Sequence, residues 1–225
     1  MNIRLPGFTR YIAITEQTRG KLAPHTGKPI DLIYCGVGDA PMSSVDKAEH
    51  PTLVCVARFV HYKNHAFLLR SFARVDSAAR LVLIGSGPER GAIEALITSL
   101  GLTGRVTVLS ELPRDELLRQ VARGHVFALA SLVEGFGIAT IEAAQQGLPY
   151  VNSDIPTHRE VLGSVGGFLV SATDQAAYAE KLSALLFDPA LRAVKSAEAR
   201  ELAGRYAWDK IAEQTEQTYL RALGR

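Results

Sequence analysis

The segment EGFGIATIEA, residues 134–143, contains residue types that can bind a ligand with several hydroxyl groups. Glu134 and Glu142 stand eight positions apart, and Gly135 and Gly137 leave the backbone beside the first carboxylate uncovered. In a continuous helix the two carboxylates would be separated by roughly 12 Å along the axis. We expect instead that Glu134 lies in a loop and that Glu142 lies one or two turns into a helix.

Each of these glutamates also has a purely structural explanation. A carboxylate near a helix start suits the helix dipole, and an exposed helical glutamate needs no ligand. Glu142, however, stands between Ile141 and Ala143, so we expect it to be partly buried and to need a partner. The uncovered amides of residues 136–138 can face a ligand oxygen at the start of the helix.

Two cations follow another expected strand, in the segment ARFVHYK. Arg58 comes just after the strand, and Lys63 stands at the start of the next helix, where a cation opposes the helix dipole by about 0.3–1 kcal/mol. A solvated lysine could tolerate that cost. An arginine and a lysine together are better explained by a bound anion, and a diphosphate would convert the pair into charge-assisted hydrogen bonds.

The segment IGSGPER, residues 84–90, is a weaker signal. Gly85 and Gly87 allow a tight turn after a strand, and Pro88 suits the first turn of a helix. A structural turn and a ligand contact explain this segment equally well. The same ambiguity holds for His158 and Arg159, which an anion at a helix start or simple exposure would explain.

A sugar nucleotide fits the pattern as a whole. It carries hydroxyl groups on two sugar rings that are joined by a diphosphate. One glutamate can accept hydrogen bonds from the transferred sugar and the other from the ribose, while the cations and the backbone amides hold the diphosphate between them.

Apolar segments alternate with helical patterns along most of the chain. The strands are nearly continuous in apolar character, which is typical of a sheet covered on both faces. Strands separated by helices predict a parallel, doubly wound Rossmann-like α/β sheet. The expected strands are 52–57, 80–85, 105–109, 125–130, 149–153 and 166–170, and the expected helices are 63–75, 88–101, 113–124 and a helix that ends near Gln146.

The two ends of the chain have a different character. Two expected strands, 11–15 and 31–37, are too few to cover a core, and residues 38–51 are expected to form a loop. The expected C-terminal helix, 208–223, carries Trp208, Ile211, Tyr219 and Leu220, which need a surface to bury against. We therefore predict three parts: the tail of a preceding Rossmann domain with a linker (1–45), a ligand-binding domain (46–203) and a crossover helix (204–225).

Composition excludes several classes of protein. A net charge of +2 and the lack of Lys/Arg-rich runs argue against nucleic-acid binding. No apolar segment is long enough to span a bilayer, and the first residues have no signal-peptide core. Cys35 and Cys55 lack metal-ligand spacing, and we expect both to be reduced and buried. These features favour a cytoplasmic protein without a metal, with peripheral association at the inner face of the membrane left open.

The segment EGFGIATIEAAQQGLPYV resembles the Glu-x7-Glu segment of retaining glycosyltransferases with the two-domain GT-B architecture, in particular glycosyltransferase family 4. VARFVHYKNHAFLLRSFA, IGSGPER and SDIPTHREVLG resemble further motifs of that family, in the same order. The resemblance covers roughly residues 10–225. It implies the C-terminal, donor-binding half of the GT-B fold.

The resemblance also implies roles for individual residues. Arg58 and Lys63 would bind the diphosphate and, with Glu134 at the donor sugar, carry catalysis. Glu142 would bind the ribose. The remaining donor contacts would come from Gly85, from Ser110, Glu111 and Leu112 near the base, and from the backbone of Phe136, Gly137 and Ile138.

The sequence departs from the family pattern at several positions. Ala57 and Asn64 stand where glycines are usual beside Arg58 and Lys63, and could reshape the diphosphate turn. The largest departure is length, because the family's N-terminal domain, which supplies the acceptor site, corresponds here only to residues 1–37. We therefore expect a fragment, or one half of a transferase that an N-terminal domain or partner chain completes.

The expected reaction is transfer of a hexosyl group from a UDP- or GDP-sugar to a glycan or lipid-linked acceptor, without a cofactor and with retention of anomeric configuration. A non-catalytic nucleotide-sugar-binding subunit is the main alternative. A sugar-nucleotide epimerase on the same scaffold is a second alternative, but it resembles the Glu-x7-Glu segment less.

Overall fold

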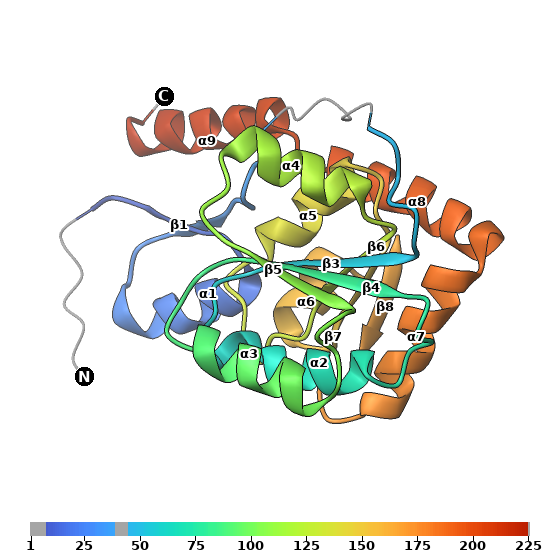
Figure 1. The fold of residues 1–225 in the computed structure, drawn as a ribbon. Coiled ribbons are helices and arrows are strands. Elements are labelled where there is room, and N and C mark those ends of the chain that lie inside the picture. The colour runs from blue at the N-terminus through green and yellow to red at the C-terminus, as the bar shows by residue number, and fades with distance from the viewer. Residues whose placement is uncertain (1–7, 39–44, 225) are drawn as a thin grey trace.

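A parallel sheet with six strands forms the centre of the computed structural model, which describes residues 8–38 and 45–224 (Figure 1). Its strand order is β5-β4-β3-β6-β7-β8. The two middle strands are buried along nearly their whole length, which agrees with their continuous apolar sequences. The strands are β3 (Thr52–Val56), β4 (Arg80–Ile84), β5 (Val106–Leu109), β6 (Val126–Leu129), β7 (Tyr150–Ser153) and β8 (Gly167–Val170).

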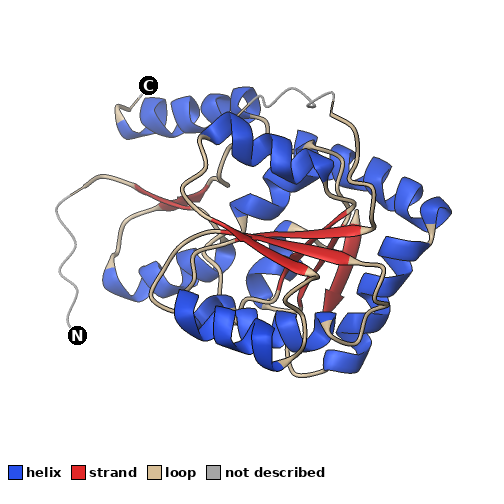
Figure 2. Ribbon diagram, in the orientation of Figure 1, coloured by secondary structure: helices blue, strands red, loops and turns tan. Residues whose placement is uncertain are grey.

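Helices cover both faces of this sheet, as the expected doubly wound fold requires (Figure 2). The helices α4 (Arg114–Arg123) and α5 (Ile138–Gln145) lie on one face. The helices α2 (His65–Phe72), α3 (Arg90–Ser99) and α7 (Gln175–Phe187) lie on the other. The remaining helices of this part are α6 (Pro156–Val161), α8 (Pro189–Gly204) and the short 3-10 helix η2 (His61–Lys63).

The strand order creates a switch point in the middle of the sheet. From β3 the chain continues to β4 and β5 on one side, whereas β6, β7 and β8 extend the sheet on the other side. Val54 of β3 is paired with Val82 of β4 and with Phe127 of β6, both in parallel. In such sheets a ligand binds outside the carboxyl ends of the strands that border the switch point.

The N-terminal residues form a separate small unit. The strands β1 (Tyr11–Ala13) and β2 (Ile30–Leu32) pair in parallel and are joined by α1 (Glu16–Leu22) and a 3-10 turn, η1 (Ala23–His25). The expected strand 31–37 is longer than the observed β2, which ends at Leu32. Beyond this strand, Val37 forms a bridge with Ala207 instead of pairing with β1. Residues 1–7 and 39–44, which belong to the predicted tail and linker, lie outside the described residues.

The last helix, α9 (Trp208–Ala222), lies beside this small unit (Figure 1). Ile211 is buried, whereas Trp208 and Tyr219 are 52% and 60% exposed, so the described residues do not supply the whole surface that this helix was expected to need. The Trp208 ring nevertheless lies against Gly36, where an added Cβ would come within 2.6 Å of the ring. The helices α7 and α8 were not among the expected elements. They pack against each other and, through α7, against the sheet, so their apolar residues face more than one neighbour.

Candidate functional site

Two loops meet at the switch point of the sheet, one after β3 and one after β6. The backbone amide of Leu132 donates a hydrogen bond of 2.8 Å to the carbonyl oxygen of Tyr62, which ties the loops together. The first loop carries Arg58 and Lys63, and the second carries Glu134. Parallel strands bring these residues together because their carboxyl ends share one edge of the sheet.

Lys63 and Glu134 form an ion pair across this junction. The distance from Lys63 Nζ to Glu134 Oε1 is 2.6 Å, and the two side chains are only 15% and 7% exposed. Ser131 Oγ donates a second hydrogen bond, of 2.7 Å, to the same carboxylate oxygen. Thr157 Oγ1 donates to the backbone carbonyl of Glu134 at 2.9 Å, so the loop is also fixed from α6.

Arg58 occupies a different position from Lys63. Its side chain is exposed and forms no ion pair or hydrogen bond within residues 8–38 and 45–224. The structure therefore brings Lys63 and Glu134 into direct contact, while Arg58 lies on the preceding part of the same loop with its guanidinium available.

The start of α5 borders a cavity of about 240 Å³ beside this ion pair. Gly137 is the N-cap residue, with a φ of 86°, and no side chain caps the first amides of the helix. Uncapped amides at a helix start are donors for an anion. The lining residues are Cys35, Lys63, Leu129, Glu134, Phe136, Gly137, Ile138 and Ala139.

The burial of two lining residues, Phe136 and Cys35, decides which of their atoms a ligand can reach. The ring of Phe136 is buried against Tyr34 and Tyr206, so only its backbone is available to a ligand. Cys35 is half-buried, which corrects the expectation that both cysteines are buried, whereas Cys55 is buried and burial raises the pKa of its thiol to about 12.

Glu142 lies on the fifth position of α5, whereas Glu134 lies in the loop, as the sequence predicted. Its carboxylate is 20% exposed and pairs with Arg114 at 2.5 Å. Glu142 does not line the cavity beside Lys63. Arg114, at the start of α4, was missed by the sequence analysis, although a cation in the first turn of a helix is the same signal that drew attention to Lys63.

Gly85 and Gly87 are required by close packing. An added Cβ would lie 1.9 Å from the Ala57 carbonyl oxygen at Gly85, and 2.4 Å from the Phe59 carbonyl oxygen at Gly87. The amide of Phe59 donates to the Ser86 carbonyl oxygen at 2.8 Å. The turn after β4 therefore supports the loop that carries Arg58.

The segment Ser110–Leu112 follows β5 at the same edge of the sheet. Arg90 donates a hydrogen bond of 2.8 Å to Ser110 Oγ. Glu111 has a φ of 57°, and the other non-glycine residue with positive φ in the described ranges is Asn64, next to Lys63. Left-handed backbone at a non-glycine residue is strained and concentrates at functional sites.

His158 is a residue of the site that the sequence analysis left undecided. It is fully buried, which corrects the reading of an exposed residue. Its Nδ1 donates to the Ser153 carbonyl oxygen at 2.7 Å, and its Nε2 has no hydrogen-bond partner in the part of the chain described here. An added Cβ at Gly137 would lie 3.4 Å from this ring, and burial lowers the pKa of His158.

Two features are absent from residues 8–38 and 45–224. No group of three or more His, Cys, Asp or Glu side chains is arranged to hold a metal ion in them. No helix among them is long and apolar enough to cross a membrane.

Comparison with known protein families identifies the class of this fold and site. The family described as "Glycosyl transferases group 1" matches residues 41–202, which is more than half of the 225 residues. The chain belongs to this family of glycosyltransferases, whose members share the GT-B fold.

Two curated relatives illustrate the match. The D-inositol 3-phosphate glycosyltransferase of Xylanimonas cellulosilytica is 31% identical over 182 residues, which are 79% of this chain and 44% of the relative. A GDP-mannose-dependent alpha-(1-6)-phosphatidylinositol monomannoside mannosyltransferase of Mycobacterium tuberculosis is 30% identical over 88% of this chain and 58% of its own length. The chain thus spans about half the length of these relatives.

Solved structures show the same fold. Sucrose-phosphate synthase from Thermosynechococcus elongatus matches 96% of this chain and 58% of its own chain, with a TM-score of 0.83 and 24% identity. HepE of Anabaena, in complex with UDP and glucose, matches 94% of this chain and 63% of its own, with a TM-score of 0.83 and 21% identity.

Proposed function

We propose that this chain is the donor-binding half of a retaining, family 4-like glycosyltransferase, which transfers a hexosyl group from a nucleoside diphosphate sugar to a glycan or lipid-linked acceptor. The observation that carries the proposal is the Lys63–Glu134 ion pair of 2.6 Å at the switch point, beside the uncapped start of α5. A cation, a carboxylate and free amides at one sheet edge can bind a phosphorylated sugar.

The diphosphate would lie between the two loops. An ammonium group donates several hydrogen bonds, and Glu134 accepts only one from Lys63. The remaining N–H groups of Lys63, the exposed guanidinium of Arg58 and the amides at Gly137 and Ile138 would hold the phosphate oxygens. Gly137 keeps side chains away from these amides.

The two glutamates share one arrangement, which suits the recognition of hydroxyl groups. In each carboxylate, Oε1 is paired with a cation. Lys63 pairs with Oε1 of Glu134, and Arg114 pairs with Oε1 of Glu142. The Oε2 atoms accept no hydrogen bond from a side chain within the described residues. Oε2 of Glu134 would accept from a hydroxyl of the donor sugar, and Oε2 of Glu142 from the ribose.

The base would lie beside the segment Ser110–Leu112. The positive φ of Glu111 gives this segment a fixed, unusual shape, and the Arg90–Ser110 hydrogen bond holds its start. Gly85 lies at the end of the neighbouring strand, where its backbone can approach the donor closely. UDP and GDP both remain candidates for the donor nucleotide.

Catalysis would depend on charge that grows on the leaving diphosphate. Lys63 and the helix-start amides are fixed before the reaction, and a preorganised donor of this kind contributes commonly about 2.7–4 kcal/mol of transition-state stabilisation. The exposed guanidinium of Arg58 would add its charge once the donor is bound. Glu134 would orient the sugar so that the acceptor attacks from the face that gives retention of configuration.

A second domain or chain would complete the site. Tyr62, Leu132, Val133 and Ile138 are each at least 40% exposed, and all four belong to the two loops of the Lys63–Glu134 pair or to the start of α5. An exposed apolar rim beside a site suits a covering partner. One relative is the gpi3 subunit of a Schizosaccharomyces pombe phosphatidylinositol N-acetylglucosaminyltransferase. We propose such a partner, and peripheral attachment at the inner face of the membrane for a lipid-linked acceptor.

Binding and product analysis test this proposal. UDP, GDP and ADP are compared by thermal shift, and one of them should stabilise the chain by roughly 2.7 kcal/mol at a concentration of 100 times its Kd. The corresponding sugar nucleotides are then incubated with the chain, alone and with a candidate N-terminal partner, and the anomeric configuration of the product is read by NMR. Failure of all three nucleotides to bind would contradict the proposal. Binding without transfer under either condition would favour the non-catalytic subunit.

A further inference from the structure

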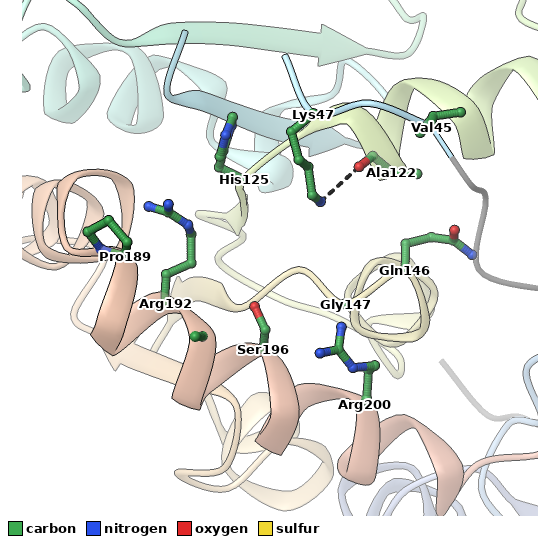
Figure 3. Close-up of a pocket in the computed structure, with 11 residues that line it drawn as sticks. Val45, Lys47, Ala122, His125, Gln146, Gly147, Pro189, Arg192, Ser196 and Arg200 are labelled. Atoms are coloured by element: carbon green, nitrogen blue, oxygen red, sulfur yellow. Dashed lines mark hydrogen bonds between the residues drawn. The ribbon is translucent and has the colours of Figure 1, made fainter. Parts of the chain in front are cut away.

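A second, larger cavity lies at the opposite edge of the sheet from the Lys63–Glu134 pair. It has a volume of about 580 Å³ and borders the amino ends of the strands, since Lys47 precedes β3, His125 directly precedes β6 and Gly147 precedes β7. Figure 3 shows the side chains of Lys47, Arg192 and Arg200 directed into the same space. None of the functional roles assigned above involves this cavity.

The lining carries positive charge without a balancing carboxylate. Lys47, Arg192 and Arg200 contribute cations, and no Asp or Glu occurs among the described lining residues. Burial lowers the pKa of Lys47, and Arg192 and Arg200 lower it further by repulsion. The pKa of His125 is lowered to about 4, first by burial and then by Arg192 and Lys47, so this ring is neutral near pH 7.

Helix ends account for two of the three cations. Lys47 Nζ donates to the carbonyl oxygens of Ala122 and Gly124, at 2.8 Å each, at the end of α4. Arg192 Nη1 donates to the carbonyl oxygens of Leu185 and Leu186, at 3.0 and 2.9 Å, at the end of α7. Cations are favourable at helix C-termini, so these contacts alone would need no ligand.

Arg200 is an exposed residue and forms no hydrogen bond with the end of any described helix. Its side chain makes no hydrogen bond or ion pair with any residue of the described chain. Gly147, with a φ of 77°, leaves room for it, because an added Cβ there would stand 2.1 Å from Arg200 Nη1. Arg192, Ser196 and Arg200 are spaced by four residues, so α8 presents both guanidinium groups and a hydroxyl on one face.

We propose that this cavity is a second anion-binding site, which takes the phosphate group of a phosphate monoester or diphosphate. The guanidinium groups of Arg192 and Arg200 would bind the phosphate oxygens in charge-assisted hydrogen bonds, with Lys47 and Ser196 as further donors. The volume leaves room for the organic part of a phosphorylated small molecule or of a lipid headgroup. The site is independent of the donor site proposed above, because it lies at the opposite ends of the strands.

The substitution Ser196→Glu tests the site without unfolding the chain. The introduced carboxylate would stand four residues from Arg192 and from Arg200, where it can pair with both and stabilise α8. We expect the melting temperature to stay equal or rise while affinity for inorganic pyrophosphate, measured by calorimetry, falls at least tenfold. Arg200→Gln should produce the same loss. Ala95→Glu adds the same charge at an exposed position of α3 and is the matched control.

Pyrophosphate could also bind at the donor site, so Arg58→Gln is measured in parallel. Pyrophosphate affinity that survives Arg58→Gln and is lost in Ser196→Glu supports the second site. To distinguish the source of the phosphate group, the same variants are tested against phosphatidylcholine vesicles with and without phosphatidic acid. Binding of the acidic vesicles that requires Arg200 identifies a lipid headgroup. If neither pyrophosphate nor acidic vesicles bind, or if Ser196→Glu and Arg200→Gln change neither affinity, the proposal is overturned.

Discussion

Lys63 Nζ lies 2.6 Å from Glu134 Oε1, and this contact joins the loop after β3 to the loop after β6. The two residues are 71 positions apart in the chain, and only the parallel pairing of β3 with β6 brings them together. This contact therefore connects the two loops at the switch point of the sheet. It also orients the two side chains that are proposed to hold the donor.

Removing one member of this pair should destabilise the fold. Lys63→Met leaves the Glu134 carboxylate buried without its cation, and a loss of about 3 kcal/mol in the free energy of unfolding is expected. The double variant Lys63→Met/Glu134→Gln should recover part of this loss, because the buried charge is then absent. Urea unfolding of the single and double variants measures both. An unchanged midpoint for Lys63→Met would show that the pair is not formed in solution.

Substitution by alanine should have opposite effects on stability at two glycines, one in the turn after β4 and one in α3. Gly87→Ala places a Cβ 2.4 Å from the Phe59 carbonyl oxygen, so the backbone must shift and stability should fall by about 1–3 kcal/mol. Gly91 lies in α3 with open space around it, and Gly91→Ala should raise stability by about 0.5–1 kcal/mol. Thermal unfolding of both variants decides this, and equal effects would contradict the close packing of the turn.

His65 should make the fold sensitive to mild acid. The residue is buried against Phe59, neither ring nitrogen has a hydrogen-bond partner among the described residues, and burial, helped by Lys63, lowers the pKa of His65 to about 4. The unfolded chain takes up this proton near pH 6.5, so between pH 6.5 and 4 it binds more protons than the folded chain. Stability should therefore fall as the pH decreases through this window, by up to about 2 kcal/mol at pH 5 for this residue.

The variant His65→Met isolates this contribution. It fills the same apolar space without a titrating group, so its stability should exceed that of the wild type at pH 5 by more than at pH 7. The control is His50→Met at an exposed position. Parallel pH profiles of unfolding for wild type and His65→Met would refute the assignment.

Glu142 should discriminate between nucleotides by their ribose hydroxyls. A hydrogen bond to a charged acceptor contributes about 1.5–3 kcal/mol, so wild-type protein should bind the matching nucleoside diphosphate at least tenfold more tightly than its 2′,3′-dideoxy analogue. In Glu142→Gln this preference should shrink, while Glu116→Gln, at a half-buried position of α4 where the carboxylate pairs with Arg119, should retain it. Calorimetric titrations with the two nucleotides measure the preference. If Glu142→Gln keeps the full preference, another residue recognises the ribose.

The sequence predicted the fold class because the apolar runs of β3, β4 and β6 are continuous and alternate with helices. It also predicted that Glu134 is in a loop and Glu142 within a helix, since Gly135 and Gly137 mark the start of α5. The helices α7 and α8 were not predicted, because their apolar residues face several neighbours and form no simple one-sided pattern.

The partners of the site residues could not be read from the sequence. Arg114 reaches Glu142 across 28 positions, and His158 is buried beneath Gly137 although its neighbour Arg159 is exposed. Such contacts depend on how the loops and helices pack, which local patterns do not encode. The assignment of Arg58, Lys63 and Glu134 to the donor rests on their residue types and spacing and on the resemblance to a family, and it stays a prediction.

The preference for a nucleoside diphosphate over the bare nucleoside is the most direct test of the proposed diphosphate site. Calorimetry is carried out on wild type, Arg58→Gln and Lys63→Gln, with Lys181→Gln on α7 as control. For each folded protein it gives the Kd of the nucleoside divided by the Kd of the nucleoside diphosphate. Because both values come from the same variant, any general loss of stability cancels. The ratio should fall at least tenfold, or about 1.4 kcal/mol, in Arg58→Gln and Lys63→Gln and stay unchanged in the control. Equal ratios in all four proteins would contradict the account.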